Sequence, residues 1–90
     1  MFEKVKGTYL GINENNIDVE TNDGTYKIFT SANTLLKTPA VNEEITLYLH
    51  QVVKEECTRI YGFLTKEEVD TFKLLLSVNG VGPYSAVVAL

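Results

Sequence analysis

The sequence predicts a mainly β fold with helices at its C-terminal end. Up to about Phe63 apolar and polar residues alternate, which is the period of a half-buried strand, and beyond Phe63 the apolar residues recur at helical spacing. The length of 90 residues limits the chain to one small core, or to a core plus a fragment of a second domain. An apolar content of 44% and a charged content of 22% are typical of a globular protein.

Three strands are expected in the first third of the chain. The first covers residues 3–10, and alternation returns in residues 15–21 and 25–30. Asn22-Asp23-Gly24 separates the second strand from the third, and glycine accepts the positive φ that a two-residue hairpin connection demands. These two strands are therefore expected to pair antiparallel.

Two further strands follow a short break. Residues 31–36 predict one helical turn, after which Thr38-Pro39-Ala40 interrupts the chain. Alternation resumes in residues 45–50 and again in residues 58–63, with Lys54-Glu55-Glu56 between them. An open sheet of this size cannot cover both of its faces, so residues 1–63 predict a closed, five-stranded barrel of the OB-fold type.

Residues 64–90 predict helices. Thr65-Lys66-Glu67-Glu68 is a capping box, in which the Thr65 hydroxyl accepts from the Glu68 N–H and the Glu68 carboxylate reaches back to the Thr65 N–H. The helix is expected over residues 65–77. Its packing face is expected to consist of Val69, Phe72, Leu75 and Leu76.

The stretch NGVGP, residues 79–83, predicts a tight connection to a second helix. Gly80 takes the left-handed conformation that ends a helix at little cost, and Pro83 suits the first turn of the next one. A Gly-x-Gly hairpin before a helix also exposes backbone N–H groups to which an anion such as a DNA phosphate can bind. Such a pattern is more often an ordinary turn, and the residues alone leave both interpretations open.

Charge and cysteine content exclude several classes of protein. The formal net charge of −4 argues against a strong nucleic-acid binder, and no apolar run approaches the length of a membrane span. The N-terminus has no signal-peptide pattern, so a cytoplasmic location is expected. Cys57 is the single cysteine and His50 has no metal-ligating neighbour in its strand, so neither a metal site nor a cofactor is expected.

Several short segments occur together in a recognisable order. These are VKGTYLG at the start, HQVVKEE from His50, YGF from Tyr61, and LLLSV followed by NGVGP. Their order and spacing resemble the RuvA family, the Holliday-junction-binding subunits of the bacterial branch-migration machine, over nearly all of the chain. In that family an OB-fold domain precedes two helix-hairpin-helix motifs and, across a linker, a domain that binds the RuvB motor ATPase. The resemblance implies that residues 1–63 are the oligomerising barrel and that residues 64–90 are the first helix-hairpin-helix of a truncated DNA-binding domain.

The resemblance also implies a function and partners. A RuvA-like chain is expected to recognise four-way (Holliday) junctions in DNA recombination, DNA repair and the SOS response to DNA damage. It would act as a homotetramer, or as an octamer of two tetramers, with RuvB bound through a missing C-terminal domain and with the RuvC resolvase as a further partner. The chain itself is expected not to be an enzyme, because no Walker-type loop is present and no nucleophile, base and orienting group stand together.

Two groups of site residues follow from the resemblance. Glu55 and Glu56 match an acidic pin that stands at the centre of the tetramer and repels the DNA strands that meet there. Tyr84 stands where relatives often have lysine, which removes one cation from the expected phosphate contact. The expected DNA-binding residues are Asn79, Gly80, Val81, Gly82, Pro83, Tyr84 and Ser85.

Two alternatives of different class remain open at this stage. A generic single-strand-binding OB fold would stack bases on aromatic side chains of the barrel, for which Tyr9, Tyr26, Phe29 and Tyr48 are candidates. An oligomerisation scaffold without a ligand is the other. Preference for four-way junctions over duplex and single strands would separate the RuvA-like function from both.

Overall fold

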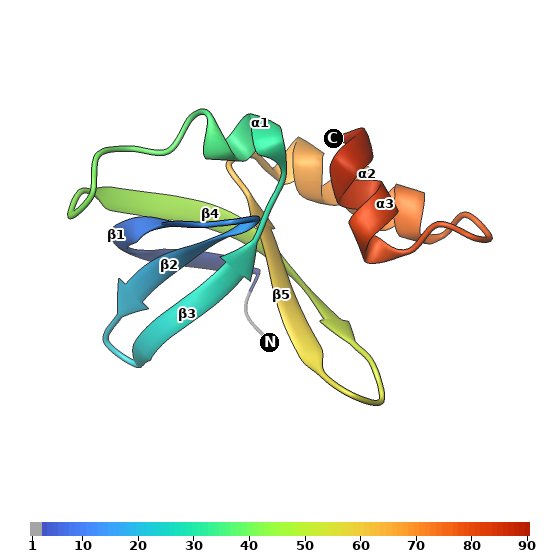
Figure 1. The fold of residues 1–90 in the computed structure, drawn as a ribbon, viewed down its shortest axis with the longest axis horizontal. Helices are drawn as coiled ribbons and strands as arrows, with labels where there is room; N and C mark the ends of the chain where they lie inside the picture. The colour runs from blue at the N-terminus through green and yellow to red at the C-terminus, as the bar shows by residue number, and fades with distance from the viewer. Residues whose placement is uncertain (1–2) are drawn as a thin grey trace.

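The structure, a computed structural model, describes residues 3–90 and consists of a barrel with a pair of helices packed on one side (Figure 1). The strands are β1 (Lys4–Asn13), β2 (Asn16–Thr21), β3 (Gly24–Phe29), β4 (Glu44–Val53) and β5 (Thr58–Phe63). The helices are α1 (Ala32–Leu35), α2 (Lys66–Leu76) and α3 (Pro83–Ala89). The predicted fold class, a five-stranded barrel followed by C-terminal helices, is confirmed. The order of the strands around the closed barrel is β1-β2-β3-β5-β4.

The barrel closes because β1 pairs with two neighbours. Its first half, from Lys4 to Thr8, pairs antiparallel with β4, and its second half, from Thr8 to Asn13, pairs with β2. The register shifts between Tyr9 and Gly11, where Gly11 has a φ of +136°. A bulge of this kind bends a strand and increases its twist, which allows β1 to pair with β4 along its first half and with β2 along its second half. The last gap is closed by a short parallel pairing between β3 and β5.

The β2–β3 hairpin turns at the predicted place, but the positive φ lies at Gly24, the first residue of β3, and not at either connecting residue. Thr21 pairs with Gly24, which leaves Asn22 and Asp23 as the two connecting residues. Gly24 has a φ of +126°, a conformation that L side chains rarely adopt. The Thr21 hydroxyl donates to the Gly24 carbonyl at 3.1 Å and accepts from the Asp23 N–H at 3.1 Å, so the side chain before the turn satisfies the turn's own polar groups.

The barrel interior is apolar and closely filled. Each strand of the β1 to β4 series directs alternate side chains inward, as the sequence pattern predicts. The buried residues of this cluster are Val5, Tyr9, Ile17, Val19, Ile28, Ile45, Leu47 and Leu49. Gly62 is required by this packing, because a Cβ there would lie 2.7 Å from Ile28 Cγ2 and 2.8 Å from Leu49 Cδ2.

Helix α2 begins at the predicted cap. The Thr65 hydroxyl accepts from the Glu68 N–H at 3.3 Å, as expected, but it also donates to the Glu68 carboxylate at 2.9 Å. Within residues 3–90 no bond from the Thr65 N–H to this carboxylate is found, so the reciprocal half of the expected capping box is replaced by the hydroxyl–carboxylate bond. The helix spans Lys66–Leu76 with Ser77 as its C-cap.

Aromatic packing fixes the helix pair on the barrel. The Phe72 side chain is fully buried, and its ring centroid lies 5.0 Å from that of Tyr61 and 5.3 Å from that of Phe63. Ala86 of α3 is buried in the same cluster, so both helices pack against β5.

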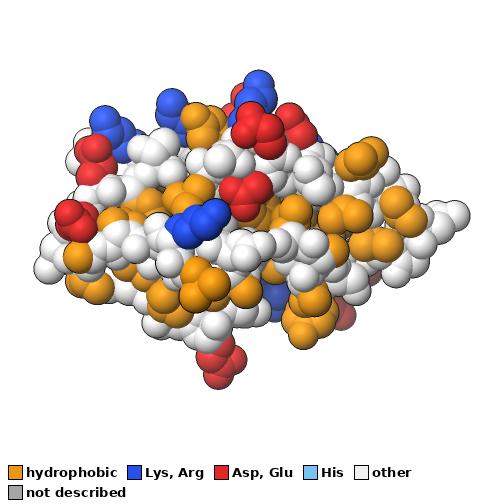
Figure 2. All heavy atoms as spheres, turned by 90° about the horizontal axis from the view of Figure 1, so that it is seen from above, with side chains coloured by type: hydrophobic (Ala, Val, Ile, Leu, Met, Phe, Trp, Pro, Cys, Tyr) orange, Lys and Arg blue, Asp and Glu red, His pale blue; other side chains and the backbone are white. Residues whose placement is uncertain are grey.

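The outer side of the helix pair carries exposed apolar side chains. Leu74, Val78, Tyr84 and Val88 are between 51% and 75% exposed. Figure 2 shows hydrophobic side chains gathered at the end of the molecule that α2 and α3 form, while acidic and basic side chains are mixed over the barrel. Within residues 3–90, none of the helices has both the length and the apolar content that crossing a membrane requires.

Candidate nucleic-acid interface

The β4–β5 hairpin carries the two predicted pin residues at its tip. Val53 pairs with Thr58, and the Lys54 N–H donates to the Cys57 carbonyl at 2.9 Å, which closes a loop over residues 54–57. Glu55 and Glu56 are both exposed in this loop. The hairpin projects from the barrel, and its tip is one of the outermost points of the molecule in Figure 1. Within residues 3–90 the one ion pair is Lys6–Glu44, at 3.6 Å, so neither pin carboxylate is neutralised by a salt bridge.

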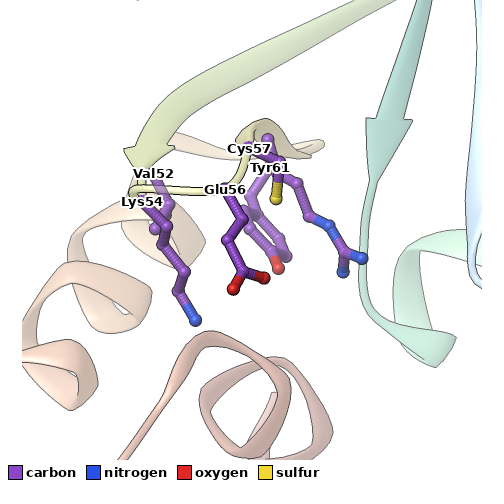
Figure 3. Close-up of a pocket in the computed structure, with 6 residues that line it drawn as sticks. Val52, Lys54, Glu56, Cys57 and Tyr61 are labelled. Atoms are coloured by element: carbon purple, nitrogen blue, oxygen red, sulfur yellow. The ribbon is translucent and has the colours of Figure 1, made fainter.

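A concavity of about 260 Å³ lies beside the tip of this hairpin and the adjoining ends of β4 and β5. In Figure 3 the side chains of Lys54 and Glu56 extend to the same side of the loop. Charges of both signs therefore line the concavity, and the exposed thiol of Cys57 is part of its wall. Its lining consists of Val52, Lys54, Glu56, Cys57, Arg59 and Tyr61.

The α2–α3 connection is a compact loop held by its own backbone. The Ser77 hydroxyl donates to the Leu74 carbonyl at 2.6 Å, and the Val81 N–H donates to the Val78 carbonyl at 3.1 Å. Gly80 has a φ of +83°, so the predicted left-handed glycine after the helix is confirmed. The loop therefore reverses direction at Gly80 and leads directly into α3.

Gly82 has an ordinary extended backbone conformation. As the N-cap of α3 it has a φ of −91° and a ψ of 175°, which any residue adopts, and a Cβ there would meet no atom within 4 Å. Replacing Gly82 should therefore not strain the turn, because only Gly80 of this pair needs a positive φ. A side chain at position 82 would occupy space in front of the loop that is now open.

The start of α3 leaves backbone donors without partners in the helix. The Ala86 N–H donates to the Gly82 carbonyl at 3.0 Å, and no side chain caps the helix. The N–H groups of Tyr84 and Ser85 precede this first bond, in the turn where an α-helix lacks intrahelical acceptors. Both residues are exposed, so an anion has access to these donors.

All seven predicted DNA-binding residues lie in this loop and the first turn of α3. Val81 and Pro83 are half-buried, and Val81 packs against the cluster that contains Phe72 and Ala86. The exposed members are Asn79, Gly80, Gly82, Tyr84 and Ser85. The ligand role of these residues, like that of the pin, stays a prediction.

Arg59 is a residue that the sequence reasoning missed. Its guanidinium carbon lies 4.6 Å from the ring centroid of Phe29, and the hydrogen bond to Tyr61 is the main cause that raises the pKa of Arg59. It is the single arginine of the sequence and follows the pin by three residues. Its place close to Glu55 and Glu56 in the sequence could have indicated a role, since a cation beside two acids alters the local electrostatic field.

His50 has a structural environment. Its ring lies edge-on to Phe72, with 6.0 Å between centroids. Burial lowers the pKa of His50, and the nearby charge of Lys73 lowers it further. Among residues 3–90, no group of three or more His, Cys, Asp or Glu side chains is arranged to hold a metal ion.

The aromatic side chains proposed for base stacking are mostly committed to packing. Tyr9 is 3% exposed and belongs to the barrel core. Phe29 is half-buried under Arg59, and Lys4 lies over the Tyr48 ring at 5.6 Å. These contacts do not leave an open row of rings of the kind that binds single strands.

Comparison with known proteins gives a consistent result. Residues 1–62 match the family described as "RuvA N terminal domain". The chain is 48% identical over 87 residues to the Holliday junction branch migration complex subunit RuvA of Clostridium perfringens (strain ATCC 13124) and 51% identical over 87 residues to that of Clostridium beijerinckii. Each match covers 97% of this chain, but 43% and 44% of the respective relative, so the chain spans less than half the length of these proteins. Their shared name designates a subunit of a complex and names no catalytic activity, in agreement with the expected non-enzymatic role. The match over most of the barrel and the high identity over nearly the whole chain show that it belongs to the RuvA N-terminal domain family.

Proposed function

We propose that this chain forms the barrel and first DNA-contacting loop of a subunit that recognises four-way (Holliday) junction DNA. The observation that carries the proposal is the 48% to 51% identity to RuvA subunits across 97% of the chain. The exposed acidic hairpin and the open backbone donors at Tyr84 and Ser85 supply a physical basis. The donors attract a phosphate without reading base sequence, and the acids repel phosphates from the hairpin tip.

These opposite effects favour a branched substrate over a straight one. A continuous duplex that approaches the loop also brings phosphates near Glu55 and Glu56. At a four-way junction the strands separate at the centre. The DNA backbone can then contact the 79–85 loops while the acidic pin occupies the space between the separated strands. The proposal includes a homotetramer, since a single chain offers one loop and one pin whereas a junction has four arms.

We extend the proposal to the partners of the complex. The RuvA-like subunit would position a RuvB motor ATPase during branch migration and would work beside the RuvC resolvase in recombination and in repair during the SOS response. A cytoplasmic location belongs to the same proposal. Tetramer formation is tested by sedimentation of the full-length protein at micromolar concentration, where a monomer would contradict it.

The central test is a binding comparison with the full-length protein. Fluorescence anisotropy on a four-way junction, a duplex of equal length and the corresponding single strand should give tightest binding to the junction. Tightest binding to the single strand would support the OB-fold alternative instead. Absence of binding to all three DNAs would leave the oligomerisation scaffold as the explanation.

A further inference from the structure

Arg59 stands between the two parts of the proposed interface. It lines the 260 Å³ concavity with Lys54 and Glu56 on the hairpin side. It also lines a small concavity of about 30 Å³ with Tyr84 and Val87 on the α3 side. Arg59 is the one lysine or arginine in the lining of that second concavity. The arginine therefore faces both the pin and the beginning of α3.

The guanidinium is held in place and carries an unneutralised charge. Phe29 supports its face, with 4.6 Å from the guanidinium carbon to the ring centroid, and the Phe29 ring itself packs on Tyr61 at 5.7 Å. No carboxylate lies within salt-bridge distance of Arg59 in the part of the chain described, residues 3–90, where Lys6 and Glu44 form the one ion pair. An arginine stacked on a ring directs its N–H donors along its planar edge, and that edge matches the geometry of a phosphate.

The small concavity limits where an anion can bind. About 30 Å³ accommodates a single water and is too small for a phosphate group. Thr30 in its wall is 2% exposed, and its hydroxyl has no hydrogen-bond partner within residues 3–90. A phosphate would consequently bind at the outer edge of this concavity, against the exposed face of Arg59.

We propose that Arg59 is a DNA-backbone contact that guides a strand from the acidic pin toward the 79–85 loop. This inference rests on the proposed junction-binding function and adds a residue to it. Glu55 and Glu56 repel a phosphate from the hairpin tip, and Arg59, three residues further along β5, attracts it to one side. Repulsion by the acids alone does not determine to which side the DNA strand moves, whereas a cation beside the acids does. The contact is with phosphate, so it adds affinity without base specificity.

The test uses Arg59→Gln and Arg59→Lys in the full-length protein, with Lys37→Gln as the matched control. Lys37 is also exposed and cationic, and it lines none of these concavities. Binding to a four-way junction and to duplex is measured by anisotropy between about 0.05 and 0.3 M NaCl. Arg59→Gln should weaken binding by about 1.4- to 5-fold for each arginine–phosphate pair that it removes, as for an exposed ion pair. The slope of log K against log salt should fall by about 0.9 for each such pair, and Arg59→Lys should retain it.

The outcomes separate this inference from the function on which it rests. If Arg59→Gln binds the junction with the affinity and salt slope of the wild-type protein, the proposed contact is overturned. Equal weakening in Arg59→Gln and Arg59→Lys overturns it too, because a structural stack on Phe29, rather than a charge, would then matter. Equal weakening in Lys37→Gln would overturn it as well, because the effect would then be one of net charge only. Failure of the wild-type protein to prefer junctions would instead contradict the proposed function itself.

Discussion

Replacing both pin residues should tighten DNA binding, which is an unusual sign for removing charged side chains from a binding surface. The perturbation is Glu55→Gln with Glu56→Gln, which keeps the size of both side chains and removes their charge. Both residues are exposed in a four-residue loop, and neither is in an ion pair within residues 3–90. The free energy of unfolding should therefore change by no more than about 0.5 kcal/mol, the usual range for surface positions.

The size of the binding effect follows from distance and screening. In water a carboxylate about 8 Å from a phosphate is repelled by about 0.5 kcal/mol. Screening reduces this to about 0.2 kcal/mol at 0.15 M salt and to about 0.4 kcal/mol at 0.01 M, because the Debye length is about 8 Å and about 30 Å respectively. In the proposed tetramer eight carboxylates act together, so affinity should rise about tenfold at 0.15 M and on the order of a hundredfold at 0.01 M.

The assay is a titration of junction and duplex DNA with the full-length protein at both salt concentrations. Duplex binding should gain at least as much as junction binding, so the preference for junctions falls. Glu20→Gln with Asp23→Asn is the matched control, because these exposed acids lie on β2 and in the β2–β3 turn and line neither concavity beside Arg59. If the pin variant binds duplex no more tightly than wild type at low salt, Glu55 and Glu56 are not a repulsive pin. A metal-binding or catalytic pair would lose function instead.

Three further predictions concern the loop, the packing and the pH dependence. Gly82→Val should leave the fold intact and weaken junction binding by about 1 to 3 kcal/mol, whereas Gly80→Val, at a φ of +83°, should lower thermal stability. Phe72→Ala should cost about 3 to 5 kcal/mol in urea unfolding, because a fully buried ring is removed between the helices and β5. The folded-state pKa of His50 is lowered by burial and by Lys73, so its neutral form favours folding, and this contribution should be lost as pH falls below the unfolded value of 6.5. Urea titrations at pH 7.5 and 5.5 should show a smaller pH effect in His50→Gln.

The strands and turns were predictable because their signals are local. Asn22-Asp23-Gly24 marks the place of the β2–β3 turn, and the structure pairs Thr21 with Gly24 across it. The extent of β4 was not predictable from alternation, since it continues to Val53 through two adjacent valines. This end of β4 belongs to the projecting hairpin and does not face the barrel interior. The alternation of apolar and polar residues that marks a core-facing strand is therefore absent there.

Barrel closure is a different kind of feature. The parallel pairing of β3 with β5 rests on Ile28 with Ile60 and Phe29 with Tyr61, which are about thirty residues apart. No local pattern encodes such a pairing, and the sequence predicted only that the barrel closes, because a small sheet must cover its faces. The place of Arg59 depends on the same pairing, because β3 brings Phe29 beside β5. The family resemblance therefore indicated the acidic pair, whereas the contact of Arg59 with Phe29 became visible only in the structure.

The charge of the interface predicts that one chain is a weak binder on its own. Residues 79–85 contain no charged side chain, so their attraction for phosphate comes from backbone donors. Beside the pin, Arg59 and Lys54 oppose two acids, which leaves no local excess of positive charge. Since each phosphate contact contributes about 0.9 to the salt slope, this surface supports only a shallow dependence per chain. Tight binding to a junction then requires several copies acting at once, so breaking the assembly should abolish junction binding even where every loop and hairpin remains folded.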